Sequence, residues 1–137
     1  MKEEEITGKD VLKLFQRKPE LIEKYLGVKI NRDTLAVDFI LANLRNVRTD
    51  IIFADTEGRD YIIMIHYKQN PSFGLRDVFL WAKGYAQYKR LPVTDIIPAL
   101  ITDEDSINSY RSIKELDRYK IKYVTYKVSD ILKELES

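Results

Sequence analysis

The fold is decided by the stretch Thr49-Asp50-Ile51-Ile52-Phe53-Ala54-Asp55, a short polar turn, and then Ile62-Ile63-Met64-Ile65-His66-Tyr67-Lys68. The apolar runs Asp50 to Ala54 and Tyr61 to Lys68 have the length of strands, and the residues between them are typical of a turn. We therefore predict an antiparallel hairpin. Because strand side chains alternate, one face of the second strand should carry Ile62, Met64, His66 and Lys68, and the other Tyr61, Ile63, Ile65 and Tyr67.

Polar groups gather at one end of this hairpin. A strand that is apolar on both faces belongs in the centre of a sheet, so His66 and Lys68 at its carboxyl end must point into a cleft or be paired. Asp50 on the neighbouring strand is the candidate to meet them. A carboxylate, an imidazole and an ammonium group together suit metal-assisted hydrolysis. The alternative is that Lys68 extends into solvent and that Asp50 is an ordinary polar residue.

The rest of the chain adds helices and two further strands. Pro19 fits the first position of a helix that ends at Gly27, after a shorter helix around Val11 to Phe15. Residues 28 to 47 are compatible with a strand or a buried helix. Further on we predict an amphipathic helix from Leu75 to about Leu91, a strand 96–101, a helix 105–119, a strand 121–126 and a terminal helix opened by Ser129 or Asp130. The expected fold class is α/β, with a mixed sheet of about four to five strands flanked by helices.

Length and composition limit the class of protein. The 137 residues are predicted to form one domain, and the chain has no cysteine, which excludes disulfides and thiolate metal sites. The net charge is +1, so nucleic-acid binding would need a local basic patch. The acidic start and the lack of an apolar run of ~18 residues predict an intracellular, cytoplasmic protein without membrane contact.

The hairpin motifs quoted above resemble those of the PD-(D/E)XK nuclease superfamily, which has a restriction-endonuclease-like fold. Residues 15 to 23 look like the lead-in helix of its archaeal branched-DNA and mismatch endonucleases, and the later helix and strands fall where these proteins have them. The resemblance covers the chain from Leu12 to Leu135. It implies phosphodiester hydrolysis with a divalent metal ion, Mg²⁺ or Mn²⁺, on a DNA substrate, and a homodimer.

Carried over by position, the resemblance makes Asp50 a metal ligand and catalytic residue and Lys68 the group that activates water. A helical acid would match Glu23 or Glu20, and spacing does not choose between them. His66 stands where the family has Asp or Glu, which should weaken Mg²⁺ binding, although imidazole suits Mn²⁺, Ni²⁺ or Zn²⁺ better. Asp77 is an alternative source of the missing carboxylate. A lone histidine at a strand end is also often a structural residue.

A second marker of the family, a Gln-x-x-x-Tyr motif, is altered on the long helix: Tyr85 matches its tyrosine, but Trp81 stands in place of its glutamine. Both rings could stack on an unpaired base or pack in the core. Basic residues that could contact DNA cluster at Arg45, Arg48, Lys83, Lys89 and Arg90. The candidates for nucleic-acid binding are Arg48, Lys83 and the aromatic residue Tyr85.

Two functions therefore stay open: a metal-dependent nuclease, and a non-enzymatic relative that binds nucleic acid or protein. A third possibility is a subunit with a tyrosine-rich interface formed by Tyr119, Tyr123 and Tyr126.

Overall fold

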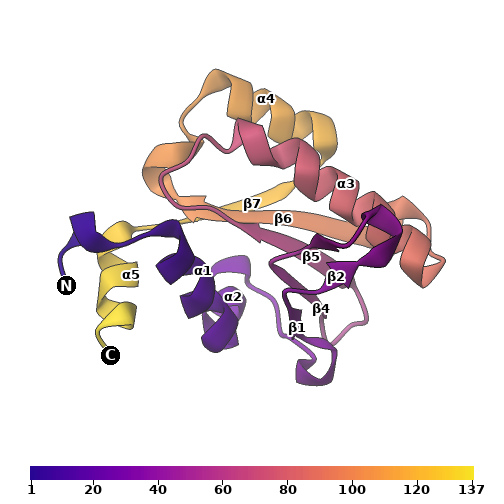
Figure 1. Ribbon diagram of the computed structural model, residues 1–137, viewed down its shortest axis with the longest axis horizontal. Helices are drawn as coiled ribbons and strands as arrows, with labels where there is room; N and C mark the ends of the chain where they lie inside the picture. Colours follow the sequence, from indigo (N-terminus) through magenta and orange to yellow (C-terminus); the bar gives the residue numbers. More distant parts are fainter.

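The computed structural model describes all residues 1–137 and is built on a five-stranded sheet with helices on both faces (Figure 1). The strand order is β1-β4-β5-β6-β7. The strand bounds are β1 Ala36–Val37, β4 Ile51–Ala54, β5 Asp60–Ile65, β6 Ile96–Asp103 and β7 Lys122–Tyr126. Strands β1, β4 and β5 pair antiparallel, whereas β5, β6 and β7 pair parallel. The predicted α/β class and mixed sheet are confirmed.

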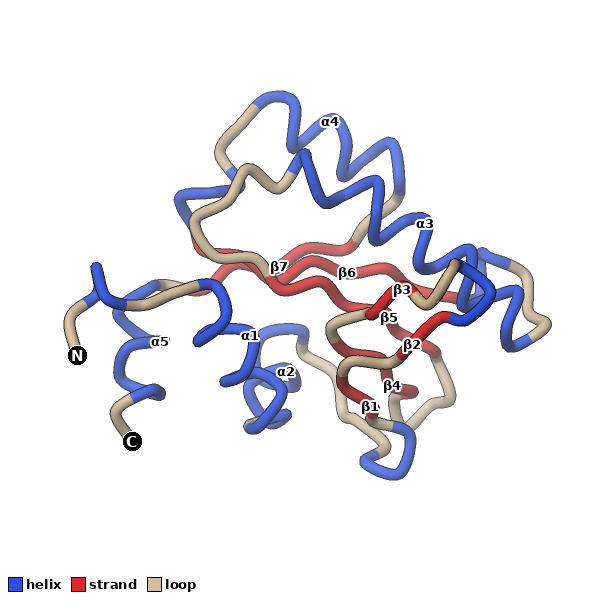
Figure 2. The backbone as a smooth tube through the Cα atoms, viewed as in Figure 1, coloured by secondary structure: helices blue, strands red, loops and turns tan.

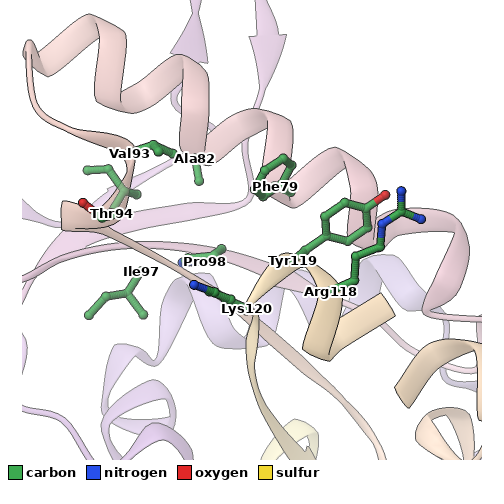
Figure 3. A pocket seen from close by; sticks show the side chains of 10 residues that line it. Phe79, Ala82, Val93, Thr94, Ile97, Pro98, Arg118, Tyr119 and Lys120 are labelled. Carbon is green, nitrogen blue, oxygen red and sulfur yellow. The ribbon is translucent and has the colours of Figure 1, made fainter. Parts of the chain in front are cut away.

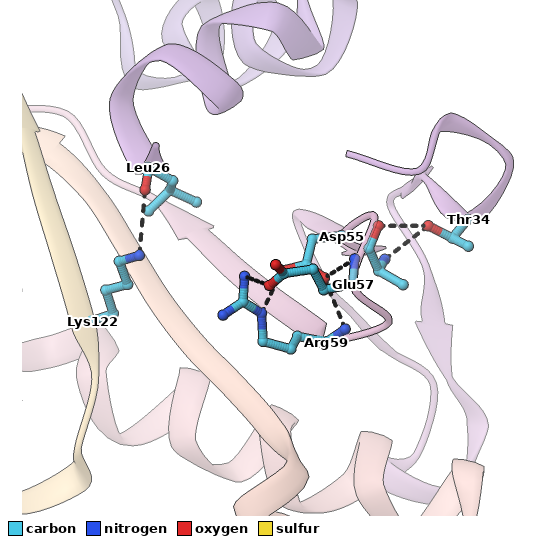
Figure 4. A network of polar contacts seen from close by, with 7 residues as sticks. Leu26, Thr34, Asp55, Glu57, Arg59 and Lys122 are labelled. Atoms are coloured by element: carbon cyan, nitrogen blue, oxygen red, sulfur yellow. Dashed lines mark hydrogen bonds and ion pairs between the residues drawn. The ribbon is translucent and has the colours of Figure 1, made fainter. Parts of the chain in front are cut away.

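The predicted hairpin is the β4–β5 pair, in which Ile52 lies opposite Ile62. Its turn is organised by Asp55, which is only 3% exposed. The carboxylate accepts hydrogen bonds from the backbone N–H groups of Glu57 and Arg59, at 3.0 and 2.9 Å, and from the Arg59 Nε at 2.7 Å (Figure 4). Burial opposes ionisation, but the contacts with Arg59 and Glu57 lower the pKa of Asp55 below its usual value.

One face of the sheet is covered by α1 Gly8–Arg17, α2 Pro19–Leu26 and α5 Val128–Leu135. The predictions for the first two helices are confirmed: Pro19 starts α2, and Gly27 ends it with a left-handed backbone at φ 67°. The core on this side includes Phe15, Ile51 and Ile63. It buries the strand side chains that were predicted to share one face.

The opposite face is covered by α3 Ser72–Lys89 and α4 Tyr110–Tyr119. The prediction of a helix from residue 105 is wrong at its start. A 3-10 turn, Glu104–Ile107, comes first, and the Ser109 side chain then caps α4 by accepting a hydrogen bond from the Ser112 N–H at 3.0 Å. The core on this side includes Ile62, Leu75 and Leu100.

Residues 28–47 contain strand β1 and part of a small flap, the two-stranded pair of β2 Ile40–Leu41 and β3 Val47–Arg48. The flap lies beside α3 (Figure 2). Asn43 donates a hydrogen bond to the Gly84 carbonyl at 2.9 Å, and a Cβ at Gly84 would come within 2.5 Å of Leu44. The small residue on α3 therefore lets the flap pack closely. None of the helices has the length and apolarity that a bilayer crossing requires.

Candidate functional site

The site begins at Asp50, just before β4 and beside the end of β5. Its carboxylate Oδ2 accepts a hydrogen bond from the Ile65 N–H at 2.9 Å. Its carbonyl oxygen accepts from the Asp38 N–H at 3.1 Å and from the Gln16 Nε2 at 3.1 Å. Asp50 thus joins α1, the β1–β2 loop and the last residue of the central strand.

The charges around Asp50 oppose its ionisation. Burial raises its pKa to about 6, the Ile65 N–H lowers it, and the negative charge of Asp38 raises it further. Gln16 also donates to the Asp38 Oδ1 at 3.2 Å, so one side chain from α1 contacts both aspartates. No ion pair of the structure includes Asp50 or Asp38. The pKa of the Asp50 carboxyl group is therefore about 6, well above its ordinary value of 3.8.

His66 directly follows β5 and is 8% exposed. Its backbone is held on both sides: its N–H donates to the Ile101 carbonyl at 2.9 Å, and its carbonyl accepts from the Tyr126 hydroxyl at 2.6 Å. The imidazole packs against Gly74, where a Cβ would lie 2.6 Å from both Cε1 and Nε2. Burial lowers the pKa of His66, partly offset by Asp103, so the ring is neutral at pH 7. Its Nδ1 is buried without a hydrogen-bond partner.

Lys68 does not continue the strand, and the prediction that β5 runs to residue 68 is wrong. The strand ends at Ile65, and Lys68 has a left-handed backbone with φ 51°. The reason is that its N–H donates to the Asp103 Oδ1 at 2.8 Å, which turns the chain away from the sheet. The ammonium lies 5.3 Å from the Tyr67 ring centroid, and Tyr67, followed by Glu3 and Asp103, raises the pKa of Lys68. The charges that act on this group thus come from residues other than Asp50.

Asp103, at the end of β6, is a site residue that the sequence analysis missed. It is 1% exposed, and its Oδ1 also accepts from the Ser106 hydroxyl at 2.7 Å. Together with Lys68, Asn70 and Ser109 it lines a wholly polar cavity of about 450 Å³. A signal was available, because Asp103 ends a buried apolar run as His66 and Lys68 do, and parallel strands end at the same edge of a sheet.

The helical acids lie elsewhere. Glu23 accepts hydrogen bonds from the Ile30 N–H at 2.9 Å and from Arg32 at 2.8 Å, and these contacts lower the pKa of Glu23. It anchors the loop after α2, while Glu20 is exposed. Asp77 is exposed on α3 and lines a separate cavity of about 360 Å³ beside the flap. The α1 residue that reaches Asp50 is Gln16, which we did not single out.

Some of the basic side chains that were predicted to contact DNA form ion pairs within the protein, and others do not. Arg48 and Lys83 are exposed, as is Arg76 seven residues before Lys83 on the same side of α3, and none of the three takes part in an ion pair. Lys89 instead pairs with Asp60 at 2.7 Å.

The aromatic side chains that were predicted to contact DNA are less exposed than the basic ones. Tyr85 is 7% exposed within the α3 core, so packing rather than base stacking accounts for its ring, and Trp81 is partly buried beside the flap. Tyr126 is 1% exposed and therefore cannot belong to an exposed tyrosine interface.

A divalent metal ion needs several oxygen or nitrogen ligands that point to one spot. No group of three His, Cys, Asp or Glu side chains in the chain meets this condition. The predicted pair Asp50 and His66 does not fit, because the imidazole is packed against Gly74 with its Nδ1 enclosed. The Asp38 carboxylate lies close enough to Asp50 to raise the pKa of Asp50.

Comparisons with known proteins add information about the fold. No protein-family model matches the chain, and no curated protein has a significant match. The crystal structure of a repair endonuclease from Pyrococcus abyssi aligns with a TM-score of 0.62 at 9% identity, covering 89% of this chain and 47% of that chain. The structure of an EndoMS–dsDNA2 complex aligns with a TM-score of 0.59 at 9% identity, covering 89% of this chain and 46% of the EndoMS chain.

These matches show that the chain shares its fold with a repair endonuclease and with EndoMS, and they confirm the predicted endonuclease-like resemblance at the level of the fold. The chain spans about half the length of each protein that it matches. The roles proposed for Asp50, Lys68, Glu23 and His66 stay predictions.

Proposed function

We propose that this chain is a nuclease-fold module that binds DNA and does not hydrolyse it through the Asp50 site. The observation that carries the proposal is that the expected catalytic groups contact different partners, and that Asp50 and Lys68 do not affect each other's pKa. The Asp50 carboxylate accepts the Ile65 N–H, the His66 ring is enclosed beside Gly74, and the Lys68 ammonium lies over Tyr67. Hydrolysis of the family's type would need these groups around one metal ion and one water.

Support for DNA as the ligand comes from the fold and from the basic side chains. EndoMS, which shares this fold, was solved as a complex with dsDNA. In this chain, Arg45 and Arg48 on the flap and Arg76 and Lys83 on α3 are exposed and lack acidic partners. Phosphate contacts by such side chains supply most of the affinity in binding that does not depend on sequence. We name these four residues the flap–α3 basic surface.

The test is fluorescence anisotropy with a labelled DNA duplex, measured between about 50 and 200 mM salt, where phosphate contacts dominate the salt dependence. The double variant Arg48→Gln, Lys83→Gln should weaken binding roughly tenfold and reduce the slope of log K against log salt by about 2, since each lost phosphate contact removes about 0.9. The matched control is Lys9→Gln, Lys13→Gln, which removes the same charge from exposed residues of α1 on the opposite face of the sheet. Equal losses in both double variants would contradict binding through the flap–α3 basic surface.

Metal-dependent hydrolysis is a second candidate, and the Asp38–Asp50 pair favours it. The negative charge of Asp38 raises the pKa of Asp50, and neither carboxylate has an ion-pair partner, an arrangement that a divalent ion would relieve. Calorimetric titration with Mn²⁺ and Mg²⁺ tests it directly. Binding in the millimolar range or tighter that disappears in both Asp50→Asn and Asp38→Asn would support a two-carboxylate metal site in place of the predicted Asp50–His66 pair.

A further inference from the structure

A pocket of about 530 Å³ lies between α3, α4 and the start of β6, at the other end of the sheet from Asp50 (Figure 3). Asp50 lies next to the carboxyl end of β5, whereas this pocket contains Ile96 and Pro98 from the amino end of the parallel strand β6. The pocket is therefore separate from the candidate site and shares no residue with it.

Most of the wall is apolar. Ala82 and Ile96 are almost fully buried at its base, and Val93 is 40% exposed at its rim. The Phe79 and Tyr119 rings form one side and pack against each other with their centroids 4.9 Å apart. A volume of this size lies within the range of ~300–1,000 Å³ that holds small organic ligands.

The charged residues that line the pocket are all positively charged. Arg118 and Lys120, at the end of α4, line it, and no acidic residue does. Neither cation takes part in an ion pair. The Arg118 guanidinium lies 5.5 Å from the Tyr119 ring centroid, on the side of the ring away from Lys120 (Figure 3). An uncharged ligand would leave both cations unused, whereas an anionic group beside an apolar body would match both parts of the surface.

We propose that this pocket is a binding site for a small organic anion, with an apolar ring or chain held by Phe79, Ala82 and Ile96 and a carboxylate-type group held by Lys120. Arg118, on the other side of the Tyr119 ring, adds positive charge to the same surface (Figure 3). The site is independent of the proposed DNA binding and of the chemistry at Asp50. Thr94, which also lines the pocket, supplies a hydroxyl group that could orient the ligand's polar end.

The test uses 8-anilino-1-naphthalenesulfonate, a fluorescent aromatic anion, with the full chain. The double variant Arg118→Gln, Lys120→Asn should weaken its binding about tenfold, since the charge-assisted contact with Lys120 and the positive charge of Arg118 are both lost. Asparagine is chosen because Lys120 has a left-handed backbone with φ 53°, which asparagine tolerates. The control Arg111→Gln, Lys114→Gln removes the same charge from exposed residues earlier on α4 and should leave binding unchanged.

Two further measurements locate the probe. Val93→Glu adds a carboxylate at the exposed rim and should weaken binding of the anion by a similar factor. N-phenyl-1-naphthylamine, which has the same rings without the sulfonate, should bind more weakly and respond to neither charge variant. Thermal unfolding of each variant shows that it is folded. Equal weakening in the pocket and control variants, or tighter binding of the uncharged probe, would overturn the proposal.

Discussion

Strand β4 has an aspartate just beyond each end, Asp55 buried and Asp50 half-buried, and their surroundings shift the pKa values of the two carboxyl groups in opposite directions. Asp55 in the hairpin turn has two backbone N–H donors and the Arg59 guanidinium, and its pKa is lowered. Asp50 at the other end has one N–H donor and a second carboxylate nearby, and its pKa is raised to about 6. The same residue type on the same strand is therefore a structural anchor at one end and an incompletely paired group at the other.

This difference indicates where a function can lie. A fully paired carboxylate has no capacity left for a ligand, whereas an underpaired one can accept a proton, a cation or a hydrogen-bond donor. Gln16, Asp38 and the end of β5 meet at Asp50 and nowhere near Asp55. The three variants below are designed to break or sharpen this contrast.

The largest effect on the free energy of unfolding is expected for Asp55→Ala. The change leaves two backbone N–H groups of a tight turn without their acceptor, at a cost of about 3 kcal/mol in the free energy of unfolding. Glu57→Ala is the control, because Glu57 pairs with the same Arg59 from a position that is 70% exposed. It should cost less than about 0.5 kcal/mol. Chemical denaturation measures both, and similar losses would show that Asp55 is not the anchor.

The cost of Asp55→Ala should also depend on pH. Because the folded-state pKa lies below the ordinary value of 3.8, the stabilisation by Asp55 is present above that pH and is lost as the pH falls through the folded-state pKa. The difference between the wild type and the variant should therefore shrink in acid.

An intermediate effect is expected for Gly74→Ala, which examines the packing at the Asp50 end of the hairpin. The new methyl group would lie 2.6 Å from the His66 ring, so the ring or the start of α3 must move, at a cost of about 2 kcal/mol. Gly8→Ala, where a Cβ meets nothing within 4 Å, is the matched control and should be neutral or slightly stabilising. Thermal unfolding compares the two, and equal stability would mean that the His66 ring is not confined.

The smallest effect, and opposite in direction, is expected for Asp50→Asn. Because the folded-state pKa of about 6 lies above the ordinary value of 3.8, ionisation of Asp50 destabilises the fold increasingly between these values, and the full penalty is present above pH 6. The amide keeps an acceptor for the Ile65 N–H and removes the repulsion from Asp38. The variant should be more stable than the wild type by about 1–2 kcal/mol at pH 8, and the two should converge near pH 4. An Asp50→Asn variant that is less stable than the wild type at pH 8 would contradict the description of Asp50 as a carboxylate with too few hydrogen-bond donors.

The sequence was sufficient for elements whose signals are local. Pro19 and Gly27 mark both ends of α2, and the apolar runs on each side of the Asp55 turn define the β4–β5 hairpin. Residues 28–47 could not be assigned, because β1, β2 and β3 are two residues long and exist only through their pairing with β4, with each other and against α3. Strands of that length have no periodicity to detect.

The candidate site was predictable only in part, for the same reason. Asp50 and His66 were found because they interrupt apolar runs. Their surroundings depend on tertiary contacts. Gln16 donates a hydrogen bond to Asp50 across 34 residues of sequence, and Asp103 accepts one from the Lys68 N–H across 35 residues. Side-chain alternation alone would have kept Lys68 on the His66 face, but that hydrogen bond ends the strand first.

The measurement that tests the central claim most directly is a cleavage assay on duplex, branched and single-stranded DNA with Mg²⁺ or Mn²⁺. Wild type and Asp50→Asn should be compared at protein concentrations that give full DNA binding by anisotropy. We expect both proteins to bind DNA with the same affinity and neither to cleave it. Metal-dependent cleavage by the wild type that is lost in Asp50→Asn would contradict the account and establish Asp50 as part of a working nuclease centre.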